Sequence, residues 1–267
     1  MNEEFERAIE ALRRAEHVVV FTGAGVSAES GIPTFRDDEG FWRRFPMDQF
    51  GTWRGLVRTA REEPKRLAEF VRCVIEPIAE AQPNAAHLAI AAAEASGVRL
   101  TVVTQNIDRL HQRAGSSTVF ELHGSLYERC GGKRQPRGVV TTPQLQRICA
   151  RLRKAERGWL PLLRTVLALR PILGIGLRGV YKPALVLFGD AMAQPAWSLS
   201  RRAAEGCDCL LQIGTSGVVY PAAMLPEDAS LAGAKIISID PEQQLADIWL
   251  KGTACEVVPR LFEAAFG

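Results

Sequence analysis

The segment HVVVFTGAGVSA, residues 17–28, carries the strongest structural signal in the chain. Its apolar, β-branched first half is typical of a strand buried on both faces. Its second half fits the Gly-x-Gly-x-x-Gly/Ala pattern of a dinucleotide-binding loop placed directly after such a strand. Gly23 and Gly25 allow a tight turn and let the backbone approach a pyrophosphate, which unpaired amides at a helix start would then meet. Alone, the pattern is weak, since a purely structural turn fits it about equally well.

Outward from this segment, short apolar runs alternate with helical patterns. Phe5, Ile9 and Leu12 recur at helical spacing before it. Strand-like runs follow at 98–104, 118–122, 184–188, 209–213 and 235–239, and helical patterns at 85–95 and 198–205 separate several of them. Such alternation predicts an α/β fold with a mostly parallel sheet covered by helices.

Two stretches break the alternation and are interpreted as insertions. They are 37–82, rich in Arg, Trp and Phe, and 127–182, with a Gly-rich basic loop and a long amphipathic section. The main domain is then expected from 1–36, 83–126 and 183–267. Ligands of open α/β sheets bind beyond the carboxyl ends of the strands, so insertions leaving from those ends would form a smaller lobe over a cofactor.

Composition bounds the class of protein. The chain has 267 residues, and its composition, with 47% hydrophobic and 24% charged residues, is that of an ordinary globular protein. No apolar run reaches the roughly 18 residues of a membrane span, and the polar, acidic N-terminus lacks the features of a secretory signal. We therefore expect no membrane partner and a cytoplasmic protein. A net charge of +3 with interspersed signs requires no nucleic-acid partner.

Charge and cysteine use leave two local questions. Between Lys133 and Lys182 the only carboxylate is Glu156, which indicates either a surface for an acidic partner or, as we favour, a solvated helix. The six cysteines are scattered and form no Cys-x-x-Cys pair, so buried thiols are expected rather than a disulfide framework.

The loop after the glycine motif argues against a plain dehydrogenase. There, a second strand ending in an acidic residue would follow about 20 positions later. Instead the chain continues with Ser30-Gly31-Ile32-Pro33-Thr34-Phe35-Arg36. Gly31 and Pro33 prevent a regular helix, while Phe35 and Arg36 would place an aromatic wall and a permanent cation beside phosphates. A surface loop with a packed Phe is the simpler alternative.

Residues 23–36 as a whole resemble the NAD-binding signature of the sirtuin family of protein deacylases. Further segments resemble other signatures of that family, in the family's order, at 104–111 (TQNIDRLH), 121–124 (ELHG), 188–190 (FGD), 214–222 (GTSGVVYPA) and 256–259 (EVVP). The resemblance implies a Rossmann-like, doubly wound large domain and a small lobe made of the two insertions. It also implies that NAD and an acylated lysine of a protein or peptide meet between them.

The resemblance further assigns roles to individual residues. It places NAD contacts at Gly23, Ala24, Gly25, Ser27, Ile32, Pro33, Phe35, Arg36, Gln105, Asn106, Ile107, Asp108, Gly214, Thr215, Ser216, Asp240 and Cys255. It places acyl-substrate contacts at Phe188, Gly189 and Asp190. Amide side chains suit the nicotinamide carboxamide, and a carboxylate can hold its amide or a water. Without the other segments, Asn-x-Asp after a strand would be interpreted as a turn or a helix cap.

His123 is the expected catalytic base, with Asn106 and Asp108 as its catalytic partners at the nicotinamide. It ends a strand-like run, where an α/β sheet presents functional groups, and its ordinary pKa lies near neutrality. In sirtuin-like chemistry the acyl oxygen attacks the ribose carbon as nicotinamide leaves, and the histidine then takes a proton from a ribose hydroxyl. The products are nicotinamide, deacylated lysine and acyl-ADP-ribose. The other histidines are weaker candidates, because His17 abuts a buried strand, His87 lies on an Ala-rich helix and His111 is interpreted as a structural or rim residue of its helix.

The chain departs from the family at the structural zinc site. Sirtuins usually carry two Cys-x-x-Cys pairs there, and tetrahedral thiolate sites need such pairs. Cys130 matches the first ligand, but Lys133, Arg170 and Leu173 stand where the other three are expected. We predict no zinc. A packed core from the helical stretch 142–169 would replace it. The expected core residues are Leu145, Ile148, Cys149, Leu152, Trp159, Leu162, Leu163 and Val166.

Two smaller departures bear on specificity. Family members that remove acidic acyl groups carry Tyr-x-x-Arg before the Pro-Asn-x-x-His segment, and residues 67–74 (LAEFVRCV) lack it. Acetyl or aliphatic acyl groups are therefore favoured over succinyl. Asp240 replaces a common Asn near the adenosine ribose, where a carboxylate still accepts ribose hydroxyls and disfavours NADP.

The resulting hypothesis is an NAD-dependent protein-lysine deacylase. ADP-ribosyl transfer or NAD hydrolysis would use the same nicotinamide pocket without an acyl-lysine channel. A non-catalytic NAD-binding module is the third alternative, although such a module has no use for His123, Asn106 and Asp108 together.

Overall fold

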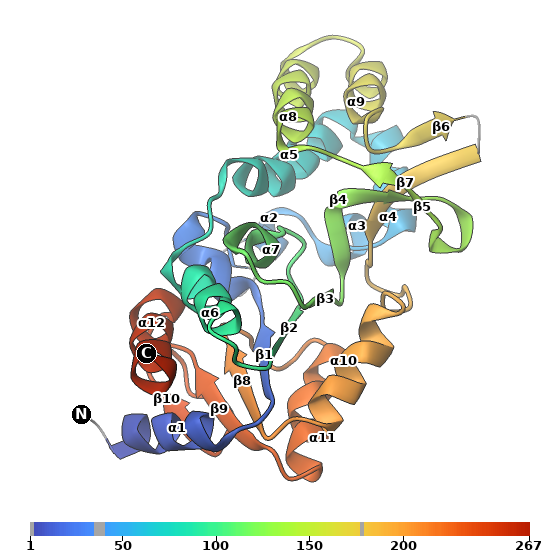
Figure 1. Cartoon of the computed structure of the whole chain (residues 1–267). Coiled ribbons are helices and arrows are strands. Elements are labelled where there is room, and N and C mark those ends of the chain that lie inside the picture. The colour runs from blue at the N-terminus through green and yellow to red at the C-terminus, as the bar shows by residue number, and fades with distance from the viewer. Residues whose placement is uncertain (1–2, 35–40, 177–178) are drawn as a thin grey trace. The chain divides into compact units, whose positions relative to one another are not determined.

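The chain folds into two compact units that alternate along the sequence (Figure 1). In the computed structural model the described residues are 3–34, 41–176 and 179–267. The first unit comprises Met1–Thr34, Gln82–His123 and Met192–Gly267, and the second comprises Phe35–Ala81 and Gly124–Ala191. Each unit has its own sheet and its own helices.

The first unit is built on a parallel sheet whose described strands follow the order β10-β9-β8-β1-β2-β3. Their bounds are β1 Val18–Thr22, β2 Leu100–Thr104, β3 Val119–Glu121, β8 Cys209–Ile213, β9 Lys235–Ile239 and β10 Ile248–Leu250. Strand β1 lies between β2 and β8, and every pairing in the sheet is parallel. The predicted α/β fold with a parallel sheet is confirmed.

Helices cover both faces of this sheet, as the continuous apolar run of β1 predicts. Val18 and Val20 pack in a cluster with helices α1 (Glu3–Arg14), α6 (Ala85–Ala95) and α12 (Ala254–Phe266). Val19 and Phe21 point the other way, into a cluster with α10 (Ala196–Glu205) and α11 (Leu225–Leu231). Alternate side chains of β1 therefore pack against helices on opposite faces of the sheet. The shorter elements of this unit are the 3₁₀ helices η1 (Ala24–Ser30) and η3 (Ala222–Met224) and helix α7 (Leu110–Ala114).

The second unit carries an antiparallel sheet in the order β5-β4-β7-β6. Its strands are β4 Gly124–Cys130, β5 Pro136–Val139, β6 Gly174–Gly176 and β7 Gly179–Leu185. The apolar run 184–188, expected in the parallel sheet, instead supplies the end of β7, which pairs with β4 and β6. That expectation was wrong because a short apolar run does not encode which strand it pairs with. The helices of this unit are α2 Phe41–Arg44, α3 Met47–Phe50, α4 Trp53–Glu62, α5 Pro64–Glu80, η2 Gly132–Arg134, α8 Thr142–Arg157 and α9 Pro161–Leu169.

Helix α8 packs against α5 with a regular apolar stripe, and α9 does not continue it. Leu145, Ile148, Cys149 and Leu152 are buried, as predicted. The prediction was wrong for the second half of the stretch, whose apolar side chains are 42–75% exposed. These exposed side chains are Trp159, Leu162, Leu163 and Val166. The helical period is interrupted after Arg157 and restarts at Pro161, so that α9 buries a different set of residues, Thr165, Ala168 and Leu169.

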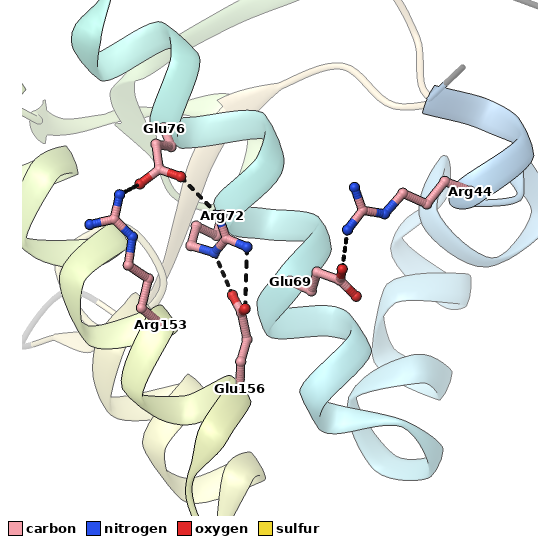
Figure 2. Close-up of polar contacts among 6 residues, drawn as sticks. All are labelled: Arg44, Glu69, Arg72, Glu76, Arg153 and Glu156. Carbon is pink, nitrogen blue, oxygen red and sulfur yellow. Dashed lines mark hydrogen bonds and ion pairs between the residues drawn. The ribbon is translucent and has the colours of Figure 1, made fainter. Parts of the chain in front are cut away.

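Charged side chains reinforce the contact between α5 and α8 (Figure 2). The guanidinium of Arg72 donates from Nε to Glu156 Oε1 at 2.6 Å and from Nη2 to Glu156 Oε2 at 3.2 Å. Its Nη1 donates to Glu76 at 2.8 Å, and Arg153 of α8 pairs with the same Glu76. The bond to Glu156 raises the pKa of Arg72. We call Arg72, Glu76, Arg153 and Glu156 the α5–α8 ion network. Arg44 of α2 pairs separately with Glu69.

The six cysteines are free thiols, as predicted, and four of them are buried. In the described part of the chain, no helix has the length and apolar character to cross a membrane.

Candidate functional site

The polar residues singled out by the sequence follow the carboxyl ends of parallel strands in the first unit. Residues 23–27 come after β1, 105–108 after β2, His123 shortly after β3, 214–216 after β8 and Asp240 after β9. Because the strands are parallel, these ends share one edge of the sheet. The strand order runs in opposite directions on the two sides of β1, so the β1 and β8 loops flank a topological switch point, where such sheets bind ligands.

Three glycines let the β1 and β8 loops lie directly against each other. A Cβ on Gly23 would approach the Gly214 carbonyl oxygen to 2.7 Å, and one on Gly25 would approach Gly214 Cα to 2.6 Å. Gly214 itself has φ 58°, in the left-handed region. The N–H groups of Gly23 and Gly25 donate to the carbonyls of Ile213 and Gly214. These two amides are therefore hydrogen-bonded within the protein, because the loops pack backbone to backbone.

Asn106, Ser27 and Asp108 form a connected polar group beside the glycine loop. Asn106 Nδ2 donates to the Gly23 carbonyl at 3.0 Å and to Ser27 Oγ at 3.1 Å. Ser27 Oγ donates in turn to Asp108 Oδ2 at 2.8 Å. Asp108 is 3% exposed and also accepts the backbone N–H of Leu110. Burial raises the pKa of the Asp108 carboxyl, and these hydrogen bonds oppose the rise.

Gln105 links this group to the predicted base. Its carbonyl accepts a hydrogen bond at 2.9 Å from Nδ1 of His123. A carbonyl only accepts, so Nδ1 carries the proton and Nε2 keeps its lone pair. Burial lowers the pKa of His123, partly offset by this bond, so the imidazole is neutral at neutral pH. The arrangement presents a fixed, unprotonated Nε2, as a general base requires.

The remaining predicted NAD residues of the first unit lie around these groups. Thr215 is buried and accepts at 2.8 Å from Gln105 Nε2, which joins the β2 and β8 loops. Asp240 is 2% exposed, and its Oδ1 accepts the N–H of Glu242. Cys255 is the second residue of α12, and its N–H donates to Glu29 Oε2. Ala24, Ile107 and Ser216 are half-buried members of the same loops.

The loop that follows the glycine motif is described only to Thr34. Gly31 ends η1 with φ 85°, so a left-handed residue stops the helix, as its sequence predicts. The N–H of Ile32 donates to the Ser27 carbonyl, and Pro33 is exposed. Phe35 and Arg36 fall outside the described residues.

Phe188, Gly189 and Asp190 belong to the second unit. They form a turn after β7 rather than a strand. The backbone N–H of Phe188 donates to the Gly51 carbonyl, and Gly189 has φ 87°. Asp190 accepts at 2.9 Å from the indole nitrogen of Trp53. The turn is thereby fixed to Gly51, before α4, and to Trp53, the first residue of α4.

Three supporting residues were not singled out from the sequence. Asn84 caps α6 and donates from Nδ2 to the Val26 carbonyl at 2.8 Å, which holds the glycine loop. Thr22 and Thr104 are paired at the ends of β1 and β2 and bond through their hydroxyls at 2.8 Å. The sequence feature that could have revealed this pair is a threonine at the last position of each of two strand-like runs.

The expected zinc position is remodelled. Cys130 is buried, and its Sγ donates weakly to the Pro183 carbonyl. Leu173 is exposed, and the Arg170 carbonyl accepts from the hydroxyl of Tyr181. Among the described residues, no group of three or more His, Cys, Asp or Glu side chains is placed to hold a metal ion. The side chain of Lys133 is outside the described set.

Comparisons with known proteins agree over nearly the whole chain. Residues 23–221 match the family model described as "Sir2 family". An NAD-dependent protein deacylase 2 of Pyrobaculum aerophilum is 38% identical, with 94% of this chain and 92% of the relative covered. A solved Sir2 homologue–NAD complex is 31% identical with a TM-score of 0.77, covering 97% and 93% of the two chains. Sir2Af2 bound to a myristoylated histone peptide is 32% identical with a TM-score of 0.70, covering 99% and 97%. The chain therefore belongs to the Sir2 family, which confirms the sirtuin resemblance of its sequence.

Proposed function

We propose that this protein removes acyl groups from lysine side chains of proteins in an NAD-dependent reaction, with His123 as the general base. The observation that carries the proposal is the 2.9 Å hydrogen bond from His123 Nδ1 to the Gln105 carbonyl. It ties the base to the same segment that presents Asn106 and Asp108. A nucleotide-binding module without chemistry has no need of an oriented base there.

The residues present fit NAD. Glycine-lined loops meet at the switch point of the sheet, where dinucleotides bind in open α/β folds. Asn106 uses its N–H₂ group within the protein, which leaves its carbonyl oxygen to accept from a carboxamide. The buried Asp240 follows β9, and a carboxylate there suits ribose hydroxyls. Relatives named NAD-dependent protein deacylases, at 35–38% identity, support the same cosubstrate.

NAD supplies a glycosidic bond whose cleavage releases nicotinamide and an ADP-ribose unit that takes the acyl group. The chain's own residues bind and orient. Asn106 and Asp108 hold the nicotinamide end, with Ser27 fixing both side chains. His123 Nε2 then accepts a proton from a ribose hydroxyl. The tautomer that this step needs is already set by the Gln105 carbonyl.

The acyl group is proposed to be acetyl or a longer aliphatic chain. A carboxylated acyl group would need a free cation, and the arginine of α5 at position 72 is held by Glu156 and Glu76. The structure of Sir2Af2 bound to a myristoylated histone peptide supports an aliphatic substrate within this family. Absence of zinc and a cytoplasmic location remain parts of the proposal, to be checked by metal analysis and by cell fractionation.

One assay tests the proposal. The protein is incubated with NAD and a panel of acetyl-, myristoyl- and succinyl-lysine peptides, and nicotinamide, peptide mass and acyl-ADP-ribose are followed. We expect nicotinamide release that depends on the acetyl or myristoyl peptide, with matching acyl-ADP-ribose, lost in His123→Ala. NAD loss without peptide, or ADP-ribose attached to protein, would instead identify an NAD hydrolase or an ADP-ribosyltransferase. NAD binding without any turnover would identify a non-catalytic module.

A further inference from the structure

A buried polar chain lies beneath the Gln105–Asn106 segment and includes a histidine that the proposed reaction does not use. Thr22 and Thr104 end neighbouring strands and are 0% and 3% exposed. His111, on α7, is 1% exposed, and its Nε2 lies 3.0 Å from Thr22 Oγ1. Thr104 Oγ1 accepts the backbone N–H of Asn106 at 3.1 Å. The chain thus runs from His111 through both hydroxyls to the backbone of Asn106.

The direction of these bonds determines the state of His111. The single hydroxyl proton of Thr22 goes to Thr104 at 2.8 Å, so Thr22 Oγ1 accepts from His111 and Nε2 carries the proton. Nδ1 is then unprotonated, and it has no hydrogen-bond partner among the described residues. A second proton would place an unpaired buried charge there. Burial, together with neighbouring His87, holds the pKa of His111 well below its usual range.

The same threonine also fixes the segment through its backbone. The Thr22 carbonyl accepts the N–H of Gln105 at 3.0 Å. The backbone N–H groups of Gln105 and Asn106 are therefore both held from the end of β1, one directly and one through Thr104. From this segment Gln105 reaches the His123 base and the Thr215 hydroxyl, and Asn106 reaches Gly23 and Ser27.

We propose that His111 is a positioning residue, which holds the Gln105–Asn106 segment in its NAD-binding geometry through the hydroxyls of Thr22 and Thr104, the second of which accepts the backbone N–H of Asn106. The inference rests on the proposed function in one respect, namely that Gln105 and Asn106 contact NAD. Loss of the chain weakens NAD binding and leaves the acyl-peptide interaction unchanged, because the chain ends at the Gln105–Asn106 segment. A merely structural histidine would lower stability without this split.

The same two strands contain a matched control at their other ends. His17, before β1, places Nε2 3.0 Å from the hydroxyl of Thr101 in β2. Both residues are buried, at 6% and 7% exposed. This pair also joins a buried imidazole to a threonine hydroxyl, although His17 Nδ1 donates to the Gly206 carbonyl, so that Nε2 accepts from Thr101. It lies near the amino ends of the strands, away from every predicted site residue. Its removal costs packing and two hydrogen bonds without touching the NAD loops.

The experiment compares His111→Leu and Thr104→Val with His17→Leu and Thr101→Val. NAD affinity is measured by calorimetry without peptide, the KM values for NAD and for acyl-peptide are measured separately, and melting temperatures monitor folding. We expect the first two variants to raise the Kd and KM for NAD about tenfold, the effect of one lost buried hydrogen bond, with the peptide KM within about twofold of wild type. The two control variants should lower the melting temperature comparably and leave the NAD Kd unchanged. His111→Gln, which keeps an N–H donor, should recover part of the affinity.

The outcomes separate this inference from the proposed function. Should His111→Leu fail to fold, Thr104→Val decides the matter, because valine keeps the β-branched shape. An NAD Kd in Thr104→Val within about twofold of wild type, or an equal loss in Thr101→Val, overturns the positioning role. If the wild-type protein deacylates no peptide, the proposed function is overturned. If His111→Leu and Thr104→Val nevertheless weaken NAD binding, the positioning role stands.

Discussion

The two units of this chain organise their functional residues in different ways. In the first unit, the candidate NAD residues sit in loops that leave one edge of a parallel sheet and are joined by short hydrogen bonds among themselves. In the second, an α5–α8 interface with a charged network joins the helices, and Lys133, Arg170 and Leu173 stand where the family resemblance places three of four zinc cysteines. Hydrogen bonds between loops therefore organise the first unit, and helix packing with ion pairs organises the second.

The contrast indicates how each half tolerates change. Glycine-on-glycine packing and buried hydrogen bonds leave little room for substitution around NAD, since a single added Cβ would meet backbone atoms. Helix packing is more permissive, because apolar side chains of similar volume can replace one another. The α5–α8 interface is therefore expected to tolerate more substitutions than the glycine loops of the first unit. Four predictions test this contrast, beginning with the largest expected effect.

Replacing the base should affect the first unit most. His123→Ala is expected to lower the deacylation rate by about 100- to 10,000-fold, the usual contribution of a general base. Exchange of labelled nicotinamide into NAD, which precedes the step that uses the base, should be reduced less. Rates measured with the acetyl-lysine peptide test this, with His17→Ala as the control histidine. Deacylation within about threefold of wild type would remove His123 from the mechanism.

Acid should destabilise the first unit selectively, because all four histidines belong to it. Burial lowers the pKa of His87 to about 4, from an ordinary value near 6.5. Between these values the unfolded chain binds a proton that the folded chain does not, so the free energy of unfolding falls as the pH drops from 6.5 to 4, on the order of 3 kcal/mol for His87. His111 contributes in the same direction.

Hydrogen exchange at pH 7.0, 5.5 and 4.5 would locate this loss. We expect faster exchange in β1, β2 and α6 before the α5–α8 interface changes. In the variant His87→Gln, the free energy of unfolding should fall less steeply with decreasing pH than in wild type. Equal acceleration of hydrogen exchange in both units would contradict a loss of stability caused by buried neutral histidines. So would an unchanged pH dependence of the free energy of unfolding in His87→Gln.

The α5–α8 ion network should contribute measurably to the second unit. Its carboxylates and Arg72 are 17–21% exposed, so solvent screens them less than surface pairs. A double-mutant cycle with Arg72→Met and Glu156→Gln is expected to give a coupling energy of about 1–2 kcal/mol. The exposed pair Arg14 and Glu10 on α1 is the matched control and should give at most about 0.5 kcal/mol. Similar coupling in the two cycles would mean that packing alone supports the second unit.

Metal removal should have the smallest effect, namely none. With Lys133, Arg170 and Leu173 in place of three cysteines, a thiolate zinc site is incomplete. We expect purified protein to hold zinc far below one equivalent and to keep its melting temperature in EDTA. Wild-type protein dialysed against zinc before EDTA treatment is the control for adventitious metal. Near-stoichiometric zinc, lost together with folding on chelation, would refute a zinc-free second unit.

For the first unit, local sequence was enough to predict the main elements and to nominate the candidate site residues. Buried strands appear in the sequence as continuous apolar runs, and the glycine loop follows β1 directly. The motifs around Asn106 and His123 are contiguous in sequence, so they can be recognised without the fold. Parallel strands bring their carboxyl ends to one edge whatever lies between them, so local motifs sufficed to predict the fold class and to nominate the site.

The support of these residues depends on contacts that form only in the folded chain. The commitment of the Gly23 and Gly25 amides to the β8 loop, the tautomer of His123 and the His111–Thr22–Thr104 chain all join residues far apart in sequence. The pairing of β7 in the antiparallel sheet and the exposed face of α9 also depend on tertiary packing. These features share one cause. Periodicity and motifs report which side chains are apolar or reactive, but a hydrogen bond or a packed contact depends on a partner that the local sequence does not specify.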